Sequence, residues 1–236
     1  MPEQGSNRRT QLIVLGVLAA LILIVAIVVS QSGSDESDSG GDSGGGETAA
    51  SVEESLAGIP QDGVLLGEPD APYKVIELID LQCPFCAEFS TGALPQVIDE
   101  QVRSGEIALE LRVISFLGED SLEAAQMAAA ATMQNRLFEF AETFFLNQGE
   151  ENSGYVDEDF LTEIAEQTPG LDVEQALEDR ESPEAQAIVE ENEAVAQELG
   201  VDSTPTFLLE SGGELALTEL TAEAFASALQ SARAGG

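Results

Sequence analysis

The sequence of 236 residues contains no histidine and no tryptophan, and Lys74 is its only lysine. Without histidine, the chain cannot form a Ser-His-Asp triad, a Cys-His dyad or a metal site with a histidine ligand. Only 8 Lys and Arg stand against 45 Asp and Glu, so the formal net charge is −37. This balance argues against nucleic acid as a partner, because phosphate binding needs clustered cations. Hydrophobic residues make up 43% of the chain, which is enough for a folded core.

The acidic character extends through most of the chain. From Val64 onward there are 36 acidic and 6 basic residues. Two explanations remain open: a high-salt habitat, where acidic surfaces with few lysines stay hydrated, and ordinary acidic solubility. In either case we expect the protein to be destabilised at low ionic strength.

Residues 12–29 form an apolar run of 18 residues without a charge. A helix of this length spans about 27 Å, close to the hydrocarbon thickness of a bilayer. Arg8 and Arg9 precede the run and acidic residues follow it. The positive-inside rule therefore places residues 1–11 in the cytoplasm and the chain after Ser30 outside. We interpret the run as an uncleaved transmembrane anchor; a cleaved signal peptide is the alternative, although its apolar region is usually shorter.

A change in composition follows the apolar run. Residues 30–46 contain no apolar residue and consist mainly of Gly, Ser and Asp, which predicts a flexible tether. Residues 47–63 have mixed composition, and we expect them to be only partly ordered, so the linker is taken as 30–63. The folded domain is expected at 64–236.

The folded part predicts two strands, at 73–80 and 106–115, separated by a helix that begins near Cys83 and bends at Pro95. Helices then fill an insert over about 118–200. A hairpin and a final helix close the chain. This order predicts an α/β fold with a central mixed sheet flanked by helices. The expected later elements are helices at 121–134, 136–146, 157–167, 172–180 and 183–199, strands at 206–210 and 214–218, and a helix at 221–233.

The two cysteines, Cys83 and Cys86, are separated by two residues and lie where the first strand gives way to a helix. Cys83 falls at the N-terminus of this helix, where free N–H groups and the macrodipole favour a thiolate. Pro84 suits the first helical position. Cys86 lies one turn further on, within disulfide distance and less exposed, which suits a resolving thiol.

Three other interpretations of the cysteine pair were weighed. A zinc site needs four ligands, and the chain has neither a second cysteine pair nor a histidine. A static disulfide that closes so short a loop stabilises the fold little. Two unrelated core cysteines rarely occur at this spacing at such a junction. We therefore expect a redox-active Cys83–Cys86 disulfide, with no other cofactor and no metal.

Residues 75–86 (VIELIDLQCPFC) resemble the active-site segment of the DsbA-like thiol–disulfide oxidoreductases of the thioredoxin superfamily, above all the membrane-anchored BdbD type. Residues 201–207 (VDSTPTF) resemble the second motif of the family, a threonine before a cis-proline. The helical insert is also similar to the one in DsbA-like proteins and is absent from plain thioredoxin. The resemblance covers roughly 60–233 and implies a thioredoxin-like fold.

The resemblance implies roles for further residues. Pro205 is expected to be cis and to pack against the cysteines, with the main chain of Thr204 free to pair with an extended substrate beside Pro84 and Phe85. A trans Pro205 is the alternative. Phe85 stands where many DsbA proteins carry a histidine. We therefore expect a Cys83 pKa below about 8.5 but less depressed than in those relatives, and a milder oxidant.

Glu77 lies where the family places a buried acid beneath the active site. By resemblance, burial raises its pKa and lets it exchange a proton with Cys86. Glu77 is also the only charged residue between Val75 and Ile79, within an apolar strand. The alternative is a glutamate at the edge of the sheet.

These features predict a membrane-tethered, extracytoplasmic oxidoreductase that introduces disulfides into exported proteins. By resemblance, a DsbB- or VKOR-type protein coupled to quinone would reoxidise Cys83 and Cys86 in a monomeric enzyme. A reductase, for example in cytochrome c maturation, would use the same site and remains an alternative. A thioredoxin-like chaperone without catalytic activity is a further one.

Overall fold

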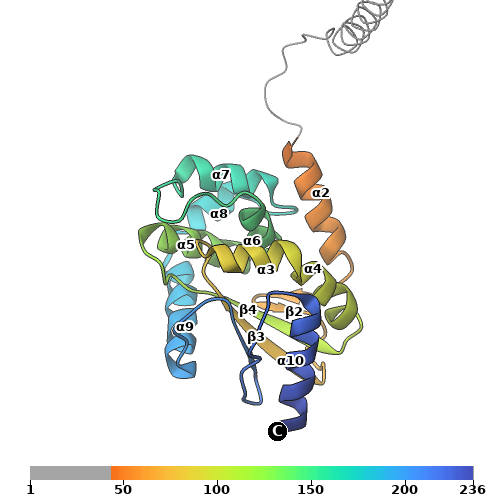
Figure 1. Cartoon of the computed structure of the whole chain (residues 1–236). Helices are drawn as coiled ribbons and strands as arrows, with labels where there is room; N and C mark the ends of the chain where they lie inside the picture. The colour runs from red at the N-terminus through yellow and green to blue at the C-terminus, as the bar shows by residue number, and fades with distance from the viewer. Residues whose placement is uncertain (1–43, 236) are drawn as a thin grey trace, which may run out of the picture. The chain divides into compact units, whose positions relative to one another are not determined.

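A computed structural model describes residues 44–235 (Figure 1). Five strands form one mixed sheet in the order β1-β2-β4-β3-β5. The two longest strands, β3 and β4, pair in parallel, and the other pairs are antiparallel. The strands are β1 (Gln61–Asp62), β2 (Leu65–Leu66), β3 (Tyr73–Ile79), β4 (Ile107–Val113) and β5 (Thr206–Leu209). The expected α/β fold with a mixed sheet is confirmed.

In Figure 1, α5 to α8 gather around α3, whereas α9 and α10 run down opposite sides of the sheet. Contacts of α6 with α2, α3, α5 and α7 make it the central helix of this layer. The helices are α2 (Gly44–Leu56), α3 (Pro84–Gly92), α4 (Leu94–Val97), a π-helical segment η1 (Ile98–Val102), α5 (Glu119–Met133), α6 (Leu137–Leu146), α7 (Glu158–Gln167), α8 (Val173–Asp179), α9 (Pro183–Leu199) and α10 (Ala222–Gly235).

Local capping chemistry sets several of these helix ends. The side chains of Asp157, Asp172 and Ser182 each accept a hydrogen bond from a backbone N–H in the first turn of α7, α8 and α9. Gly200 ends α9 with φ of 69°, a conformation that glycine adopts without strain. Each of these caps depends on one residue and one turn of backbone.

A cluster of three aromatic rings holds α3 to the rest of the domain. The ring of Phe89 on α3 lies 4.7 Å from that of Phe207 on β5 and 6.1 Å from that of Phe225 on α10. Phe207 and Phe225 meet edge to face at 5.6 Å. Because these rings are fully or almost fully buried, they fix the helix that carries the cysteines against the strand that follows Pro205.

The structure differs from the expected linker at 30–63. Residues 44–56 form α2, and residues 61–62 form β1. Val52 and Leu56, four positions apart, are buried on one side of α2. Arg103 also donates to the main-chain oxygens of Ser55 and Ala57 at the end of this helix. A short apolar stripe and one distant arginine therefore order a segment whose composition suggested partial disorder.

The prediction of a second hairpin strand at 214–218 is also wrong. Only an isolated bridge between Leu208 and Glu214 forms, with Leu215 N–H donating to Phe207 O at 2.8 Å. Leu215 is buried in the core, and Leu217 packs against the core from the same segment. The chain after Leu215 therefore covers the core and does not extend the sheet.

Within residues 44–235, no helix is long and apolar enough to cross a bilayer. The predicted cytoplasmic segment 1–11, the predicted anchor 12–29 and the first part of the predicted linker, 30–43, lie outside the described residues.

Candidate active site

The two cysteines lie at the carboxyl end of β3, where the loop after the strand turns into α3. Cys83 occupies the N-cap position, its N–H donates to Asp80 O at 2.9 Å, and Pro84 begins the helix. Both cysteines are free thiols. Cys83 is 5% exposed and Cys86 is 1% exposed. Cys83, the expected nucleophile, is therefore the cysteine nearer to the surface.

The environments of the two sulfurs separate their pKa values. A hydrogen bond from the Cys86 thiol is the largest of the effects that lower the pKa of Cys83 to about 6, and it outweighs burial. Hydrogen bonds from Thr204 and from the backbone of Cys86 and Phe85 add to it. Burial raises the pKa of Cys86, and so do the hydrogen bond to Cys83 and the charge on that sulfur. At neutral pH, Cys83 is thus mainly a thiolate and Cys86 a thiol.

Thr204 and Pro205 come from the other end of the domain and meet the cysteines here. The Thr204–Pro205 peptide bond is cis, in agreement with the sequence expectation. In its protonated form, the Cys83 thiol donates to Thr204 O at 3.4 Å. β5, which begins at Thr206, pairs with β3 and brings this peptide beside α3.

Pro84 and Phe85 form the exposed start of α3. Both side chains are open to solvent, and Phe85 is 60% exposed. A second large apolar side chain, Phe116, is also exposed, and its N–H donates to Asp80 just before the cysteine loop. Exposed apolar side chains therefore lie next to the cysteine loop.

Glu77 lies in the middle of β3, opposite Leu111 on β4 and Phe207 on β5. It is 2% exposed, and its Oε2 has no hydrogen-bond partner among the described residues. Burial raises its pKa to about 8, and the charge of Glu142 contributes. Because β3 has a partner on both sides, the alternative of an edge-facing glutamate is wrong.

Glu142 was not among the residues selected from the sequence. It lies on α6, 8% exposed, and Ser55 on α2 donates to its Oε2 at 3.0 Å. Burial raises its pKa to about 7. Glu139, one turn earlier, is also buried and accepts from Gln61 at 2.8 Å. The sequence signal was two glutamates within the largely apolar run LFEFAETFFL.

Asp80 was expected only as the last residue of the strand at 73–80. This fully buried carboxylate accepts four hydrogen bonds, from the N–H groups of Gln82, Phe116 and Leu117 and from the Ser121 hydroxyl. All four lie at 2.7–2.9 Å. Asp80 therefore ties the cysteine loop to the segment that leads into α5.

The loop between α6 and α7 supports the cysteine loop from the other side. Gln148 Nε2 donates to Leu81 O at 2.7 Å and to Cys83 O at 3.2 Å. Gln82, which is buried, donates to the Tyr155 hydroxyl at 2.9 Å. The helical insert thus supports the backbone of Leu81 and Cys83.

Comparison with known proteins agrees with this geometry. A family model described as thioredoxin matches residues 60–231. A Bacillus cereus protein named probable disulfide bond formation protein D is 31% identical over 144 residues, which cover 60% of this chain and 67% of the relative. The chain belongs to the DsbA-like thiol–disulfide oxidoreductases. The resemblance stated from the sequence is confirmed.

Solved structures share the fold of this DsbA-like chain. Oxidised BdbD from Bacillus subtilis superposes with a TM-score of 0.64 at 20% identity, covering 73% of this chain and 96% of that one. A thioredoxin-like oxidoreductase from Silicibacter pomeroyi gives 0.58 at 28% identity, covering 78% and 98%. The chemistry of this family uses a cysteine pair as its redox group. Within residues 44–235, no cluster of three or more His, Cys, Asp or Glu could hold a metal ion.

Proposed function

We propose that this thiol–disulfide oxidoreductase works as an oxidase that introduces disulfides into exported proteins. The observation that carries the proposal is the position of Cys83 at the N-cap of α3, where a hydrogen bond from Cys86 lowers its pKa to about 6 while burial raises the pKa of Cys86. A stabilised thiolate favours the reduced enzyme, so the oxidised enzyme gives up its disulfide readily. The names of the Bacillus relatives, which refer to disulfide bond formation, support the same direction.

In this proposal Cys83 is the nucleophile of the pair and Cys86 the resolving thiol. A substrate thiolate attacks Cys83 Sγ, the Cys83–Cys86 bond breaks, and Cys86 leaves as a thiolate that takes up a proton. A second substrate thiolate then attacks the substrate sulfur of the mixed disulfide and releases Cys83 as a thiolate. Glu77 is the proposed proton donor to Cys86, since it is buried with a pKa of about 8.

The substrate is proposed to lie across Thr204, Pro205, Pro84 and Phe85. Thr204 contacts the Cys83 sulfur through its main-chain oxygen, so a chain bonded to Thr204 would lie beside the nucleophile. Phe85 offers apolar surface without a charge. Such a surface suits unfolded polypeptides with exposed apolar side chains better than one particular folded partner.

The proposed setting is outside the cytoplasmic membrane. Residues 12–29 would anchor the monomeric enzyme, with residues 1–11 in the cytoplasm. An oxidising compartment favours disulfide formation. A quinone-coupled membrane protein of the DsbB or VKOR type would accept the electrons from Cys83 and Cys86.

The deciding experiment is the reduction potential of Cys83–Cys86, measured in glutathione buffers with alkylation of free thiols. A value near −120 to −180 mV supports the oxidase, since strong oxidants and isomerases lie there. A value near −270 mV or below, as in thioredoxin, contradicts it and favours the reductase. The reductase remains an alternative because Phe85 cannot stabilise the Cys83 thiolate by charge. A Cys83→Ser variant, which cannot form the disulfide, is the control.

A further inference from the structure

Proton transfer to Cys86 poses a problem of access. Cys86 is 1% exposed, and it hydrogen-bonds with Cys83 and Thr204, two residues of the proposed substrate site. When the Cys83–Cys86 bond breaks, Cys86 must gain one proton; when the bond forms again, Cys86 must lose one. With a substrate chain covering Cys83, that proton has no open route through the front of the site. A route from behind the cysteines would solve this problem.

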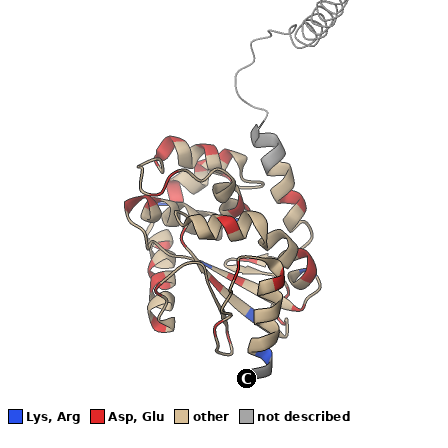
Figure 2. Cartoon of the chain, in the orientation of Figure 1, with Lys and Arg blue, Asp and Glu red and all other residues tan. Residues whose placement is uncertain are grey.

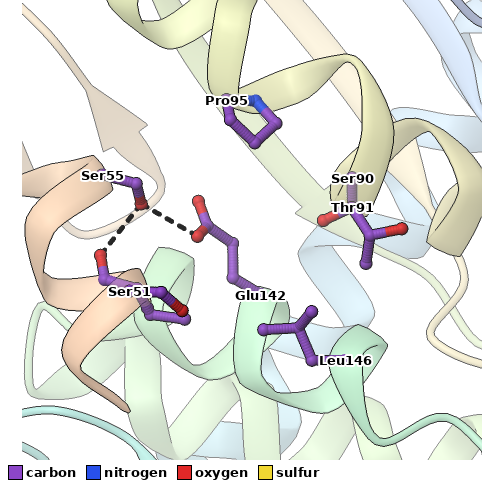
Figure 3. Close-up of a pocket in the computed structure, with 8 residues that line it drawn as sticks. Ser51, Ser55, Ser90, Thr91, Pro95, Glu142 and Leu146 are labelled. Atoms are coloured by element: carbon purple, nitrogen blue, oxygen red, sulfur yellow. Dashed lines mark hydrogen bonds between the residues drawn. The ribbon is translucent and has the colours of Figure 1, made fainter. Parts of the chain in front are cut away.

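A pocket opens behind the site, between α2, α3 and α6 (Figure 3). Its volume is about 240 Å³, room for several water molecules. Ser90 lines this pocket and lies on α3 four positions after Cys86, so both residues share one face of the helix. The pocket therefore reaches to within one helical turn of the resolving cysteine.

Glu142 lines the same pocket from α6. Figure 3 shows its side chain extending between Ser55 and Pro95. Its Oε2 accepts from Ser55, but its Oε1 has no hydrogen-bond partner among the described residues, although the side chain is more than nine-tenths buried. A buried carboxylate oxygen without a protein partner requires water or another donor. The pocket is where that donor would come from.

We propose that Glu142 relays protons between Glu77 and water in this pocket. The inference rests on the proposed role of Glu77 as the proton donor to Cys86. The path runs from Cys86 to Glu77 and on to Glu142 and the pocket. One proton moves inward along it when Cys86 leaves as a thiolate, and one moves outward when the Cys83–Cys86 bond forms again.

The electrostatic surroundings suit a relay in both directions. The pKa of Glu77 is raised to about 8 and that of Glu142 to about 7, so a proton passes between them without a large free-energy step. Glu142 is the charged group that acts on Glu77, and Glu139 on α6 is the one that acts on Glu142. From α2 and α3, the neutral hydroxyls of Ser55 and Ser90 face the pocket. Among the described residues, no titratable group on α5 or α7 shifts the pKa of Glu142.

Single-turnover kinetics test the relay. The oxidised full-length chain is mixed with a peptide dithiol whose fluorescence changes when its disulfide forms, between pH 6 and 8. We expect Glu142→Gln to slow this oxidation about tenfold or more and to alter its pH profile, because a general acid is lost. The matched control is Glu163→Gln, an exposed carboxyl on α7 that does not line the pocket. Its rate should stay within about twofold of wild type.

Rescue separates a relay from a structural role. Formate added to Glu142→Ala should restore the rate in proportion to its concentration, since a small acid can enter the pocket. Thr91→Trp, at an exposed residue of the pocket lining, keeps the carboxylate but blocks access, and should also slow the reaction. This variant tests the relay if the Glu142 variants do not fold. A wild-type rate for Glu142→Gln, an absence of formate rescue, or a wild-type rate for Thr91→Trp would each overturn the relay.

Glu77→Gln distinguishes this inference from the proposal on which it rests. If Glu77→Gln is slow and Glu142→Gln is fast, the relay alone is wrong and the role of Glu77 stands. If Glu77→Gln is as fast as wild type, the role of Glu77 and the relay both fail. The proposal that Cys83 and Cys86 transfer a disulfide does not depend on this result. The reduction potential still decides whether the enzyme is an oxidase or a reductase.

Discussion

The sulfur of Cys83 lies 3.4 Å from the main-chain oxygen of Thr204, a residue 121 positions further along the chain. β5 places Thr204 there by pairing with β3, and the contact between Phe89 and Phe207 fixes α3 against the same strand. The reactive sulfur and the peptide expected to receive substrate are therefore held as one unit. The helical insert adds to this unit through Gln148, which donates to the main-chain oxygen of Cys83.

The reactivity of Cys83 should depend on Cys86 even without disulfide chemistry. The hydrogen bond from Cys86 is the largest of the effects that lower the Cys83 pKa to about 6. Cys86→Ala removes this donor, so we expect the Cys83 pKa to rise by about one to two units. The pH dependence of iodoacetamide alkylation, with the labelled residue identified by mass spectrometry, measures the change. An unchanged inflection near pH 6 would show that Thr204 and the helix N-terminus suffice.

The cysteine site could be predicted from sequence because its elements are local. Two cysteines separated by two residues, a proline at the first helical position and a preceding apolar strand all lie within one short segment. The same holds for the helix caps at Asp157 and Ser182, where one side chain and one turn decide the outcome.

The rest of the site could not be predicted because it depends on distant contacts. From the sequence alone, Glu142 is one residue of an aromatic helix. Its surroundings become apparent only when α2 and β3 are placed beside that helix. Asp80 reads as the end of a strand until Phe116 and Ser121 converge on its carboxylate. α2 becomes ordered only because its buried side chains meet the remainder of the domain. The hydrophobic periodicity of a single segment does not indicate its contacts with distant segments.

Glu77 should make the protein less stable as the pH rises. Its pKa is about 8 in the folded state against 4.5 for the free side chain. Between these values the unfolded chain releases the proton while the folded protein keeps it, so the free energy of unfolding falls with pH. The slope is up to about 1.4 kcal/mol per pH unit for one group. Glu142, whose pKa is raised to about 7, adds a slope of the same sign below pH 7.

Urea unfolding between pH 5 and 8 measures this slope. The glutamine of Glu77→Gln is neutral in the folded and the unfolded state, so the stability of this variant should depend less on pH than that of wild type. Its gain in stability over wild type should be largest at pH 8. Glu88→Gln, on the exposed side of α3, is the control and should follow wild type. Parallel curves for Glu77→Gln and wild type would contradict the raised pKa.

Asp80→Asn should destabilise the domain strongly. The carboxylate accepts four hydrogen bonds from the cysteine loop and from the segment before α5. An amide in its place offers one acceptor oxygen and points N–H groups at N–H donors. Donors left unsatisfied in a buried site cost about 1–3 kcal/mol each, so we expect a loss of about 3 kcal/mol or more. Chemical denaturation measures it, and Asp99→Asn on the exposed side of η1 should change little.

Salt should stabilise the protein by screening repulsion among its carboxylates. Every Lys and Arg from Lys74 to Arg233 already has an acidic partner. Figure 2 shows Asp and Glu spread over helices and loops with few Lys or Arg among them. The remaining carboxylates therefore repel one another, and the Debye length of about 30 Å at 0.01 M salt lets them act across the domain. We expect the Tm to rise steadily between 0.01 and 1 M NaCl.

The comparison with a neutral osmolyte shows whether screening is the cause. Excluded solutes also stabilise folded proteins, but sucrose at matched osmolality does not screen charge. If repulsion dominates, NaCl should raise the Tm well beyond sucrose, with most of the gain below about 0.15 M, where the Debye length shortens most. Equal gains from both solutes would mean that the acidic surface adds little repulsion. Arg112 offers a local check: it pairs with Glu110 and Glu191, so Arg112→Gln should steepen the dependence of Tm on salt.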